Sequence, residues 1–596
     1  MSEIFNSRKS EFKRPFGALA SGTEAAFRLL NLFENDRTVL CIERDGGDNV
    51  LRVPMRYENG RFCAEYTFAE EGLYFYRFEL ADGREIRRTA NGEGIISSDG
   101  APFQQTVYSN DYRAPHGFAG GVMYQIFPDR FNIGGGVLDP VFGERRMRSD
   151  VDGTPQYSFA KGERACCDFW GGNLRGIAEK LDYIASLGVD CIYLNPICEA
   201  HSNHRYNTAD YLKIDPLLGT EEDFVNLCRA SHERGIKIIL DGVFNHTGDD
   251  SVYFNRYGTY PEAGAYQSRD SRYFGWYNFK HWPDEYGCWW GIADLPDIND
   301  SCGNFVDFIC GEGGVIDRWL SLGADGIRLD VADELPDSFI ERISQAVKRR
   351  GGETLLLGEV WEDASNKTAY GVRRRYLLGH ELDSVMNYPF RGAILRFLWS
   401  GDAEAFGEEI FSIYENYPRP MLDLAMNMLG THDTPRALNA LTLQLDRGHA
   451  MSRDEEAVRI LAKDEYLRGA ELFTLACALQ FTLPGIPCIY YGDEIGMQGF
   501  SDPFCRGFMR WDAPDEHITE SVRHISHHRA ENRDVFAHGE LVPIKFADGV
   551  AAFERRSDAG RVVVAVNRGE QTAVMDIGGE SIEVLPWRYA IKRIAK

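Results

Sequence analysis

The sequence predicts an α/β protein in which a (β/α)8 TIM barrel lies between an N-terminal and a C-terminal β-sandwich. At 596 residues the chain is too long for a single hydrophobic core. Short alternating β-like runs occupy both ends. Between them, very apolar strands alternate with amphipathic helices, as expected of parallel βα units buried on both faces. A doubly wound open sheet is the alternative, but no GxGxxG motif follows the first strand.

The first predicted domain, residues 1–116, is an N-terminal β-sandwich. From about 20 to 85, runs such as TVLCIER, RFCAEYTF and LYFYRFEL alternate in hydrophobicity, and the turn sequences GGDN, ENG and ADG separate them. Residues 86–116 are interpreted as a connecting arm.

The predicted barrel covers residues 117–538 and contains eight strand-like segments. They are 122–127, 191–196, 237–244, 326–331, 355–361, 384–390, 424–430 and 487–494. A helix over 174–187 has one apolar stripe and ends at Gly188. The next begins at Thr220 with Asp223 in capping-box spacing and stops at Gly235. Further helices are expected over 316–323 and near 519–538.

Two more segments complete the predicted architecture. The connection after the third strand, about 246–300, is too long for an ordinary βα loop, so it is interpreted as a small inserted domain. Its aromatic cluster, residues 274–290, either stacks on a ligand or packs the insertion, and packing is the prediction for most of it. Residues 539–596 return to β alternation and predict the C-terminal β-sandwich.

Charge and composition exclude several classes of function. Lys and Arg number 65 against 91 Asp and Glu, a net charge of −26, which argues against nucleic acid and anionic membranes as partners. The N-terminal stretch has no apolar signal core, and no run of 18 apolar residues occurs, so a cytoplasmic protein is expected. The thirteen cysteines form no CxxC pair, which favours buried reduced thiols over disulfides or zinc.

Polar side chains follow the barrel strands where catalytic groups gather in this fold. Strand three ends in DGVFNH, with Asp241, Asn245 and His246. Strand four carries Arg328 and Asp330, which point to the same face because they are two apart. Glu359 ends strand five, and Thr431, His432 and Asp433 end strand seven. Each has a structural explanation on its own, but their convergence on one rim indicates an active site.

A glycosidic bond needs two carboxylates with different protonation states. One must be ionised to attack the anomeric carbon, and the other must hold a proton for the leaving oxygen. Arg328 would favour the ionised form of Asp330, while neighbouring carboxylates would raise the pKa of Glu359. The arginine in an otherwise apolar strand is therefore predicted to hold a nucleophile ionised.

These motifs resemble those of the α-amylase family of glycoside hydrolases over about 117–511, in the order DGVFNH, GIRLDVADE, GEVWED and LGTHDTPR. The resemblance implies that Asp330 is the nucleophile, Glu359 the general acid/base and Asp433 the transition-state stabiliser. His246, Arg328 and His432 would hold the cleaved sugar, and Tyr206, with His204 beside it, would form an aromatic platform. Asp502 and Arg506 would bind a sugar further along the chain. Asp241 and Asn245 would support the site.

Within that family, FWGGNLRGI, HRYNTADY, EVW and LGTHDTPR look most like the neopullulanase, cyclomaltodextrinase and maltogenic amylase group. The resemblance implies hydrolysis of α-1,4 bonds in maltooligosaccharides, pullulan, cyclodextrins or starch, and possible homodimerisation through the N-terminal domain. Trp361 would stack on the leaving-group side, with a core aromatic as the alternative.

Two alternative functions stay open, and one prediction concerns metal ions. An α-1,6-acting or transglycosylating enzyme would share the same motifs. A non-catalytic glucan-binding protein would be expected to lack a carboxylate, and none is missing. The family's calcium loop after the first strand is replaced by NIGGGVLD at 132–139, so no cofactor and no metal are predicted.

Overall fold

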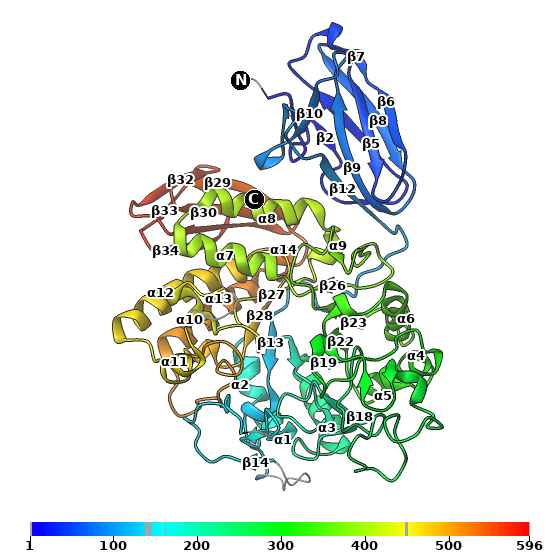
Figure 1. Ribbon diagram of the computed structural model, residues 1–596. Coiled ribbons are helices and arrows are strands. Elements are labelled where there is room, and N and C mark those ends of the chain that lie inside the picture. The colour runs from blue at the N-terminus through cyan, green and yellow to red at the C-terminus, as the bar shows by residue number, and fades with distance from the viewer. Residues whose placement is uncertain (1–2, 137–144, 161–162, 447–450, 595–596) are drawn as a thin grey trace.

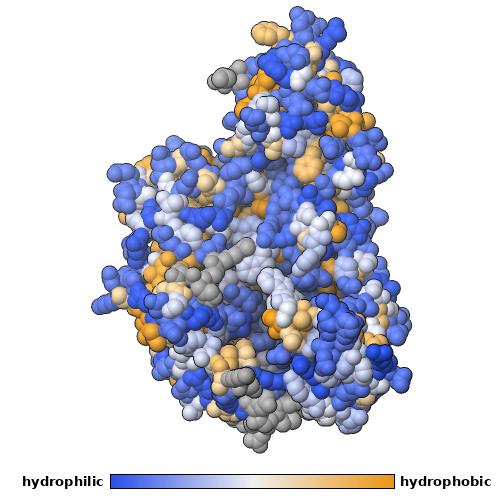
Figure 2. All heavy atoms as spheres, in the orientation of Figure 1, coloured by the Kyte–Doolittle hydropathy of each residue, from blue (hydrophilic) through white to orange (hydrophobic). Residues whose placement is uncertain are grey.

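The computed structural model describes residues 3–136, 145–160, 163–446 and 451–594. In Figure 1 the N-terminal sandwich lies above the barrel, and the C-terminal sheet packs beside the helices α7 (Tyr388–Ser400) and α8 (Ala403–Asn416). The face in Figure 2 is mainly hydrophilic, as the net charge leads one to expect. Among the described residues, no helix is both long and apolar enough to cross a membrane.

The N-terminal domain is built from two antiparallel-rich sheets packed face to face. One contains β5 (Val39–Arg44), β9 (Gly72–Glu79) and β12 (Phe103–Tyr108), and the other contains β4 (Thr23–Leu29) and β8 (Arg61–Phe68). Alternate residues of these strands, such as Phe27, Tyr76 and Phe78, fill the space between the sheets. The alternation seen in the sequence therefore reflects one face of each strand that points into this core. The residue limits of the domains remain predictions.

The N-terminal sandwich contacts the barrel domain at two places. Arg8 forms ion pairs with Glu408 (2.9 Å) and Glu415 (3.2 Å) on α8. The second contact, called the tether below, is a set of hydrogen bonds between the sandwich and the segment after the fifth barrel strand. Gln104 Nε2 donates to Ser365 Oγ (2.8 Å), and Arg373 Nε donates to Asp45 Oδ2 (2.8 Å).

The barrel sheet is parallel, and within the described chain it contains eight strands, as predicted. They are β13 (Met123–Ile126), β16 (Cys191–Leu194), β19 (Lys237–Gly242), β22 (Gly326–Leu329), β23 (Leu355–Gly358), β26 (Ser384–Val385), β27 (Met426–Met428) and β28 (Ile486–Tyr490). A parallel bridge between Met386 and Met426 closes the sheet between β26 and β27. Alternate residues of the strands fill the interior, for example Ile239, Leu357 and Met428.

The helices surround the barrel, and α1 to α3, α5 and α13 lie where helices were predicted. They include α1 (Leu174–Glu179), α2 (Leu181–Ser186), α3 (Glu221–His232), α4 (Gly303–Cys310), α5 (Val315–Ser321), α6 (Asp337–Lys348), α10 (Ala437–Leu443), α12 (Lys463–Gln480) and α13 (Glu516–Glu531). The capping box at Thr220 is present. The helix predicted over 174–187 is two helices, because the backbone at Lys180 leaves the helical region.

The segment after β19 and the C-terminal domain are both compact. In the segment after β19, short strands β20 (Phe279–His281) and β21 (Glu285–Tyr286) pair, and the buried Phe254 packs against Phe279 and Tyr286. In the latter, β29 (Glu540–Ala547), β30 (Val550–Ser557), β31 (Gly560–Asn567) and β34 (Arg588–Ile594) form an antiparallel sheet covered by the β32–β33 hairpin (Ala573–Ile577 and Glu580–Val584).

Candidate active site

The strand register brings the predicted carboxylates to one end of the barrel. Asp241 pairs in register with Arg328, and Leu329 pairs with Gly358. Asp330 and Glu359 therefore follow neighbouring strands at the same height. Because side chains alternate along a strand, Asp241 and Glu359 continue the inward rows that Ile239 and Leu357 begin. At this end of the barrel, the inward-pointing side chains thus change from apolar to charged.

Arg328 lies at the centre of this cluster and is fully buried. Its Nη1 donates to Asp241 Oδ1 (2.7 Å) and to Asp330 Oδ1 (3.0 Å), and its Nη2 donates to Glu359 Oε2 (2.7 Å). Asp241 Oδ2 also accepts from the hydroxyls of Tyr193 (2.6 Å) and Tyr206 (2.8 Å). One guanidinium therefore fixes the relative positions of the two carboxylates that the sequence singles out.

The expectation that Arg328 holds Asp330 ionised is corrected, because Arg328 is shared and the pKa of Asp330 is raised on balance. Burial raises the pKa of Asp330 well above its ordinary value, and the charges of Glu359, Asp241 and Asp433 act in the same direction. Arg328 lowers that pKa, but its single charge faces three carboxylates. In the site without substrate, burial and the neighbouring carboxylates therefore favour the protonated form of Asp330.

The raised pKa of Asp330 predicts a pH-dependent change in stability. A carboxyl group whose pKa is higher in the folded state loses stability as the pH rises from its unfolded value near 3.8 through the folded value. Asp330→Asn removes this cost, so we expect its thermal midpoint at pH 7 to exceed that of the wild type by roughly 2 to 4 °C. The gain should vanish at pH 4. Differential scanning calorimetry at the two pH values measures both, with the exposed Asp307→Asn as the control.

If the Asp330→Asn gain were equal at both pH values, or if Asp307→Asn showed the same gain, the charge of Asp330 would not be its cause.

Asp433 lies on the opposite side of the site, after β27. Its Oδ2 is 3.0 Å from His432 Nε2, and its Oδ1 accepts from Arg506 Nη2 (3.1 Å). Burial acts to raise the pKa of Asp433, but the charges of His432, Arg506 and Arg328 outweigh it and hold the pKa below its ordinary value. Arg506 also pairs with Asp502 (2.8 Å). Asp433 is therefore held as an anion beside the guanidinium of Arg506.

An aromatic and imidazole surface lies between these carboxylates. The Tyr206 ring stacks on that of His432, with centroids 5.3 Å apart and planes 5° from parallel. The Tyr206 hydroxyl contacts His432 Nε2 (2.5 Å). Burial lowers the pKa of His246 to about 4, and burial together with Arg506 lowers that of His204 well below its usual range. These two imidazoles are therefore neutral and suited to uncharged hydroxyl groups.

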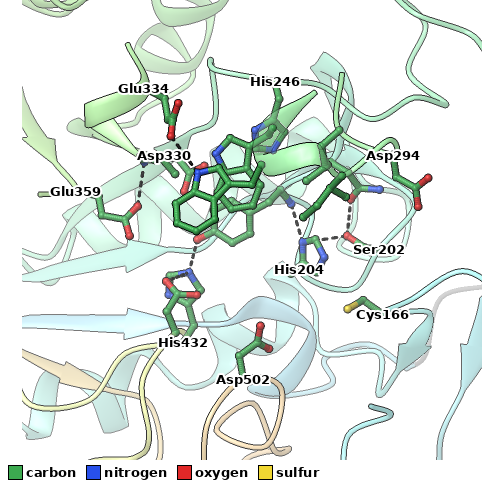
Figure 3. Close-up of a pocket in the computed structure, with 18 of the residues that line it drawn as sticks. Cys166, Ser202, His204, His246, Asp294, Asp330, Glu334, Glu359, His432 and Asp502 are labelled. Atoms are coloured by element: carbon green, nitrogen blue, oxygen red, sulfur yellow. Dashed lines mark hydrogen bonds and ion pairs between the residues drawn. The ribbon is translucent and has the colours of Figure 1, made fainter. Parts of the chain in front are cut away.

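A pocket of about 910 Å³ opens above the cluster. Figure 3 shows Asp330, Glu359, His246 and His432 around it, with Asp502 further along. Of the predicted site residues, Arg328 lies below the pocket floor and the others line it: His204, Tyr206, His246, Asp330, Glu359, Trp361, His432, Asp433, Asp502 and Arg506. The sequence-based selection is therefore brought together in space, whereas the roles remain proposals.

The barrel region matches a known family model. The match is to the alpha amylase catalytic domain and covers residues 125–538. The chain belongs to the α-amylase family.

Named members of the α-amylase family are similar over most of this chain. An amylopullulanase of Thermoanaerobacterium saccharolyticum is 34% identical over 630 residues, which cover 94% of this chain and 47% of the relative. A cyclomaltodextrinase of Geobacillus thermopakistaniensis is 32% identical over 89% of this chain and 84% of its own length. The chain thus spans about half the length of that amylopullulanase.

Among solved structures, the fold is similar to that of the cyclic alpha-maltosyl-(1-->6)-maltose hydrolase of Arthrobacter globiformis. It superimposes with a TM-score of 0.68 and 29% identity, over 81% of this chain and 100% of the hydrolase.

Trp361 combines the two interpretations that the sequence left open for it. Its ring stacks on Tyr388 at 3.8 Å, which is a packing contact. It also lines the pocket, and its Nε1 donates to Glu359 Oε1 (3.0 Å). With Arg328 and the Val331 amide (2.9 Å), Trp361 fixes the orientation of Glu359 in this α-amylase fold.

Several pocket residues were not singled out from the sequence. Trp289 and Trp290 line the pocket, although packing was expected for most of their cluster, and Trp290 is 77% exposed. The Trp290 Nε1 donates to Glu334 Oε1 (3.1 Å), which also binds the Tyr370 hydroxyl. Phe274 and Phe279 do pack, stacked at 5.2 Å. Glu334 lies within GIRLDVADE, so its position four residues after Asp330 was the available signal.

No group of three or more His, Cys, Asp or Glu side chains in the described ranges has the arrangement of a metal site. The loop at 132–139, on which the calcium prediction was based, extends into residues 137–139, which lie outside the described residues. That prediction therefore stays untested.

Proposed function

We propose that this chain is a retaining hydrolase of α-1,4-glycosidic bonds in maltooligosaccharides, pullulan, cyclodextrins or starch. The observation that carries the proposal is the pair Asp330 and Glu359, both bound to the guanidinium of Arg328 beneath an open pocket. Two carboxylates held beside each other with one retained proton can cleave a glycosidic bond by double displacement.

In the proposed first step, Glu359 gives its proton to the glycosidic oxygen while Asp330 attacks the anomeric carbon. Positive charge develops on that carbon and favours the ionised form of Asp330 as it attacks. The leaving chain departs past Trp361. Glu359 then removes a proton from water, and the water attacks the glycosyl–Asp330 ester to release a product of unchanged anomeric configuration.

The remaining residues hold the sugar during these steps. Asp433, which is ionised, accepts hydroxyl hydrogen bonds and stabilises the positively charged sugar ring. Tyr206 supplies the aromatic face beneath the ring, and the neutral His246 bonds its hydroxyls. Asp502 and Arg506 hold the next glucose unit on the non-reducing side. These roles follow the match of each residue to the family's motifs.

Analysis of products from pullulan and β-cyclodextrin tests the proposal. Pullulan consists of maltotriose units joined by α-1,6 bonds, so cleavage of α-1,4 bonds yields panose or its isomer, whereas cleavage of α-1,6 bonds yields maltotriose. We expect panose-type trisaccharides, and proton NMR should show the α-anomer first. Asp330→Asn prepared in parallel controls for contaminating enzymes. Maltotriose as the main product would instead support the α-1,6 alternative, which the names of the amylopullulanase and the maltosyl-(1-->6)-maltose hydrolase keep in view.

The proposal includes a homodimer formed through the N-terminal sandwich, in the cytoplasm. This part of the proposal follows the resemblance to the neopullulanase and cyclomaltodextrinase group, and Phe33 (80% exposed) is an apolar side chain on that domain that such a contact would bury.

Transglycosylation is compatible with the proposed mechanism, because a sugar hydroxyl can replace water in the second step.

A further inference from the structure

The segment after β23 carries a short hairpin beside the pocket. Its strands β24 (Thr368–Ala369) and β25 (Val372–Arg373) pair, and Tyr370 and Gly371 form the turn between them. Both turn residues have positive φ angles, 50° for the tyrosine and 79° for the glycine. Two-residue turns of this kind favour asparagine followed by glycine, and an aromatic residue in this backbone conformation is strained. The turn alone therefore does not explain the tyrosine.

Tyr370 reaches the pocket from this turn. Its side chain lines the pocket together with Trp361, although the residue is 74% exposed. Its hydroxyl donates to Glu334 Oε1. Figure 3 shows Glu334 and Glu359 on one side of the pocket and Cys166 on the other. Tyr370 therefore lies on the same side as Glu359, the proposed general acid, and its ring is open to a ligand.

The hairpin has little core of its own to hold this ring in place. Of residues 368–373 only Ala369 is buried, and Val372 is 55% exposed. Because a short isolated hairpin is only marginally stable in water, its position depends on contacts with other parts of the chain. On the barrel side, Lys367 Nζ pairs with Asp333 Oδ2 at 3.1 Å.

The tether to the N-terminal sandwich holds both arms of the hairpin. Before β24, the Gln104 amide donates from Nε2 to Ser365 Oγ (2.8 Å) and accepts at Oε1 from Asn366 Nδ2 (2.8 Å). At the end of β25, Arg373 Nε donates to Asp45 Oδ2 (2.8 Å). Gln104 belongs to β12 and Asp45 follows β5, so two separate parts of the sandwich fix the hairpin.

We propose that Tyr370 binds a glucose unit of the leaving chain and that Gln104 and Asp45 of the sandwich position it for this contact. The inference rests on the proposed function, in which the leaving chain departs past Trp361. A tyrosine ring offers an apolar face on which a glucose ring can stack. Tyr370 thus discriminates between leaving groups, whereas Gln104 and Asp45 act through it as positioning residues. The sandwich thereby takes part in substrate selection by the active site of its own chain.

Maltoheptaose and α-maltosyl fluoride together test the inference, because the first loses a glucan chain and the second a single fluoride ion. The measured quantity, the leaving-group ratio, is kcat/KM for maltoheptaose divided by kcat/KM for the fluoride. Tyr370→Asn keeps the turn, since asparagine favours its backbone conformation, but removes the ring. We expect the leaving-group ratio to fall roughly three- to ten-fold, as for the loss of one aromatic contact. Asp45→Ala should lower it by a smaller factor.

A double variant and a matched control show whether the sandwich acts through Tyr370. Adding Asp45→Ala to Tyr370→Asn should lower the leaving-group ratio no further, because the ring that the ion pair positions is already absent. Glu408→Ala is the control, since it removes an ion pair that joins Arg8 of the sandwich to α8, away from the pocket. An equal fall in Glu408→Ala, or additive effects in the double variant, would overturn the positioning role.

An unchanged leaving-group ratio in Tyr370→Asn would overturn the inference and leave the proposed function in place. A wild type that hydrolyses neither substrate would instead overturn the proposed function, and the inference with it. Thermal unfolding shows whether each variant is folded. If Asp45→Ala is not, Gln104→Ala, which removes only the amide contacts, decides the positioning role in the same way.

Discussion

Replacement of Asp330 by asparagine should lower kcat for maltoheptaose hydrolysis by a factor on the order of 10⁴ or more. The amide cannot form the glycosyl ester, and it cannot balance the positive charge that develops on the sugar. The substitution is nearly isosteric, so the Oδ1 contact with Arg328 Nη1 at 3.0 Å can persist. Loss of activity would then reflect chemistry and not a collapsed site.

The measurement compares initial rates of reducing-end release for the purified variant and the wild type. Asp307→Asn serves as the control because its carboxylate is 72% exposed on α4, away from the pocket. Hydrolysis near the wild-type rate in Asp330→Asn would reject Asp330 as the nucleophile and, with it, the double displacement.

Glu359→Gln should lose activity on maltoheptaose by a factor of about 10³ to 10⁴, because the leaving oxygen no longer receives a proton. The effect should depend on the leaving group. With α-maltosyl fluoride, whose fluoride departs without protonation, the first step should continue and fluoride release should show a burst. The second step lacks its base, so a maltosyl ester on Asp330 should accumulate and be visible by mass spectrometry of the intact protein.

The control for this substitution is Glu341→Gln, on the surface of α6, where the carboxylate pairs only with Arg375 among the contacts described. Equal losses on maltoheptaose and on the fluoride would mean that Glu359 acts by positioning Arg328 or the Val331 amide, to both of which its Oε2 is bonded. The two substitutions together separate a nucleophile from an acid, because only Glu359→Gln should trap a covalent product.

Much of the barrel was predictable because it depends on local patterns. Apolar runs between capped helices identify the strands, and parallel strands bring the residues at their carboxyl ends to one rim. Asp241, Asp330 and Glu359 could thus be expected together before any coordinates were known. The break of the first predicted helix at Lys180 was not predictable, because the apolar stripe continues through it.

What the sequence did not reveal are contacts between loops that are distant in the chain. An ion pair between Arg164 and Asp249, for example, joins residues 85 positions apart, and no periodicity links them. The sharing of Arg328 among three carboxylates was also missed, because strand spacing shows which side chains share a face but not how a guanidinium divides its donors. Trp290 was undervalued for a similar reason, since a cluster of aromatic letters does not show which member remains exposed.

The hydrogen bonds between the N-terminal sandwich and the segment after β23 limit how far this chain can be shortened toward its barrel. Ser365 and Arg373, two of the residues bonded to the sandwich, flank Lys367 and Tyr370, which line the pocket. A minimal catalytic unit that begins at the first barrel strand would leave that flank of the cleft without its scaffold. The sandwich thus supports the side of the cleft that carries Glu359, and a shortened enzyme would have to replace these contacts.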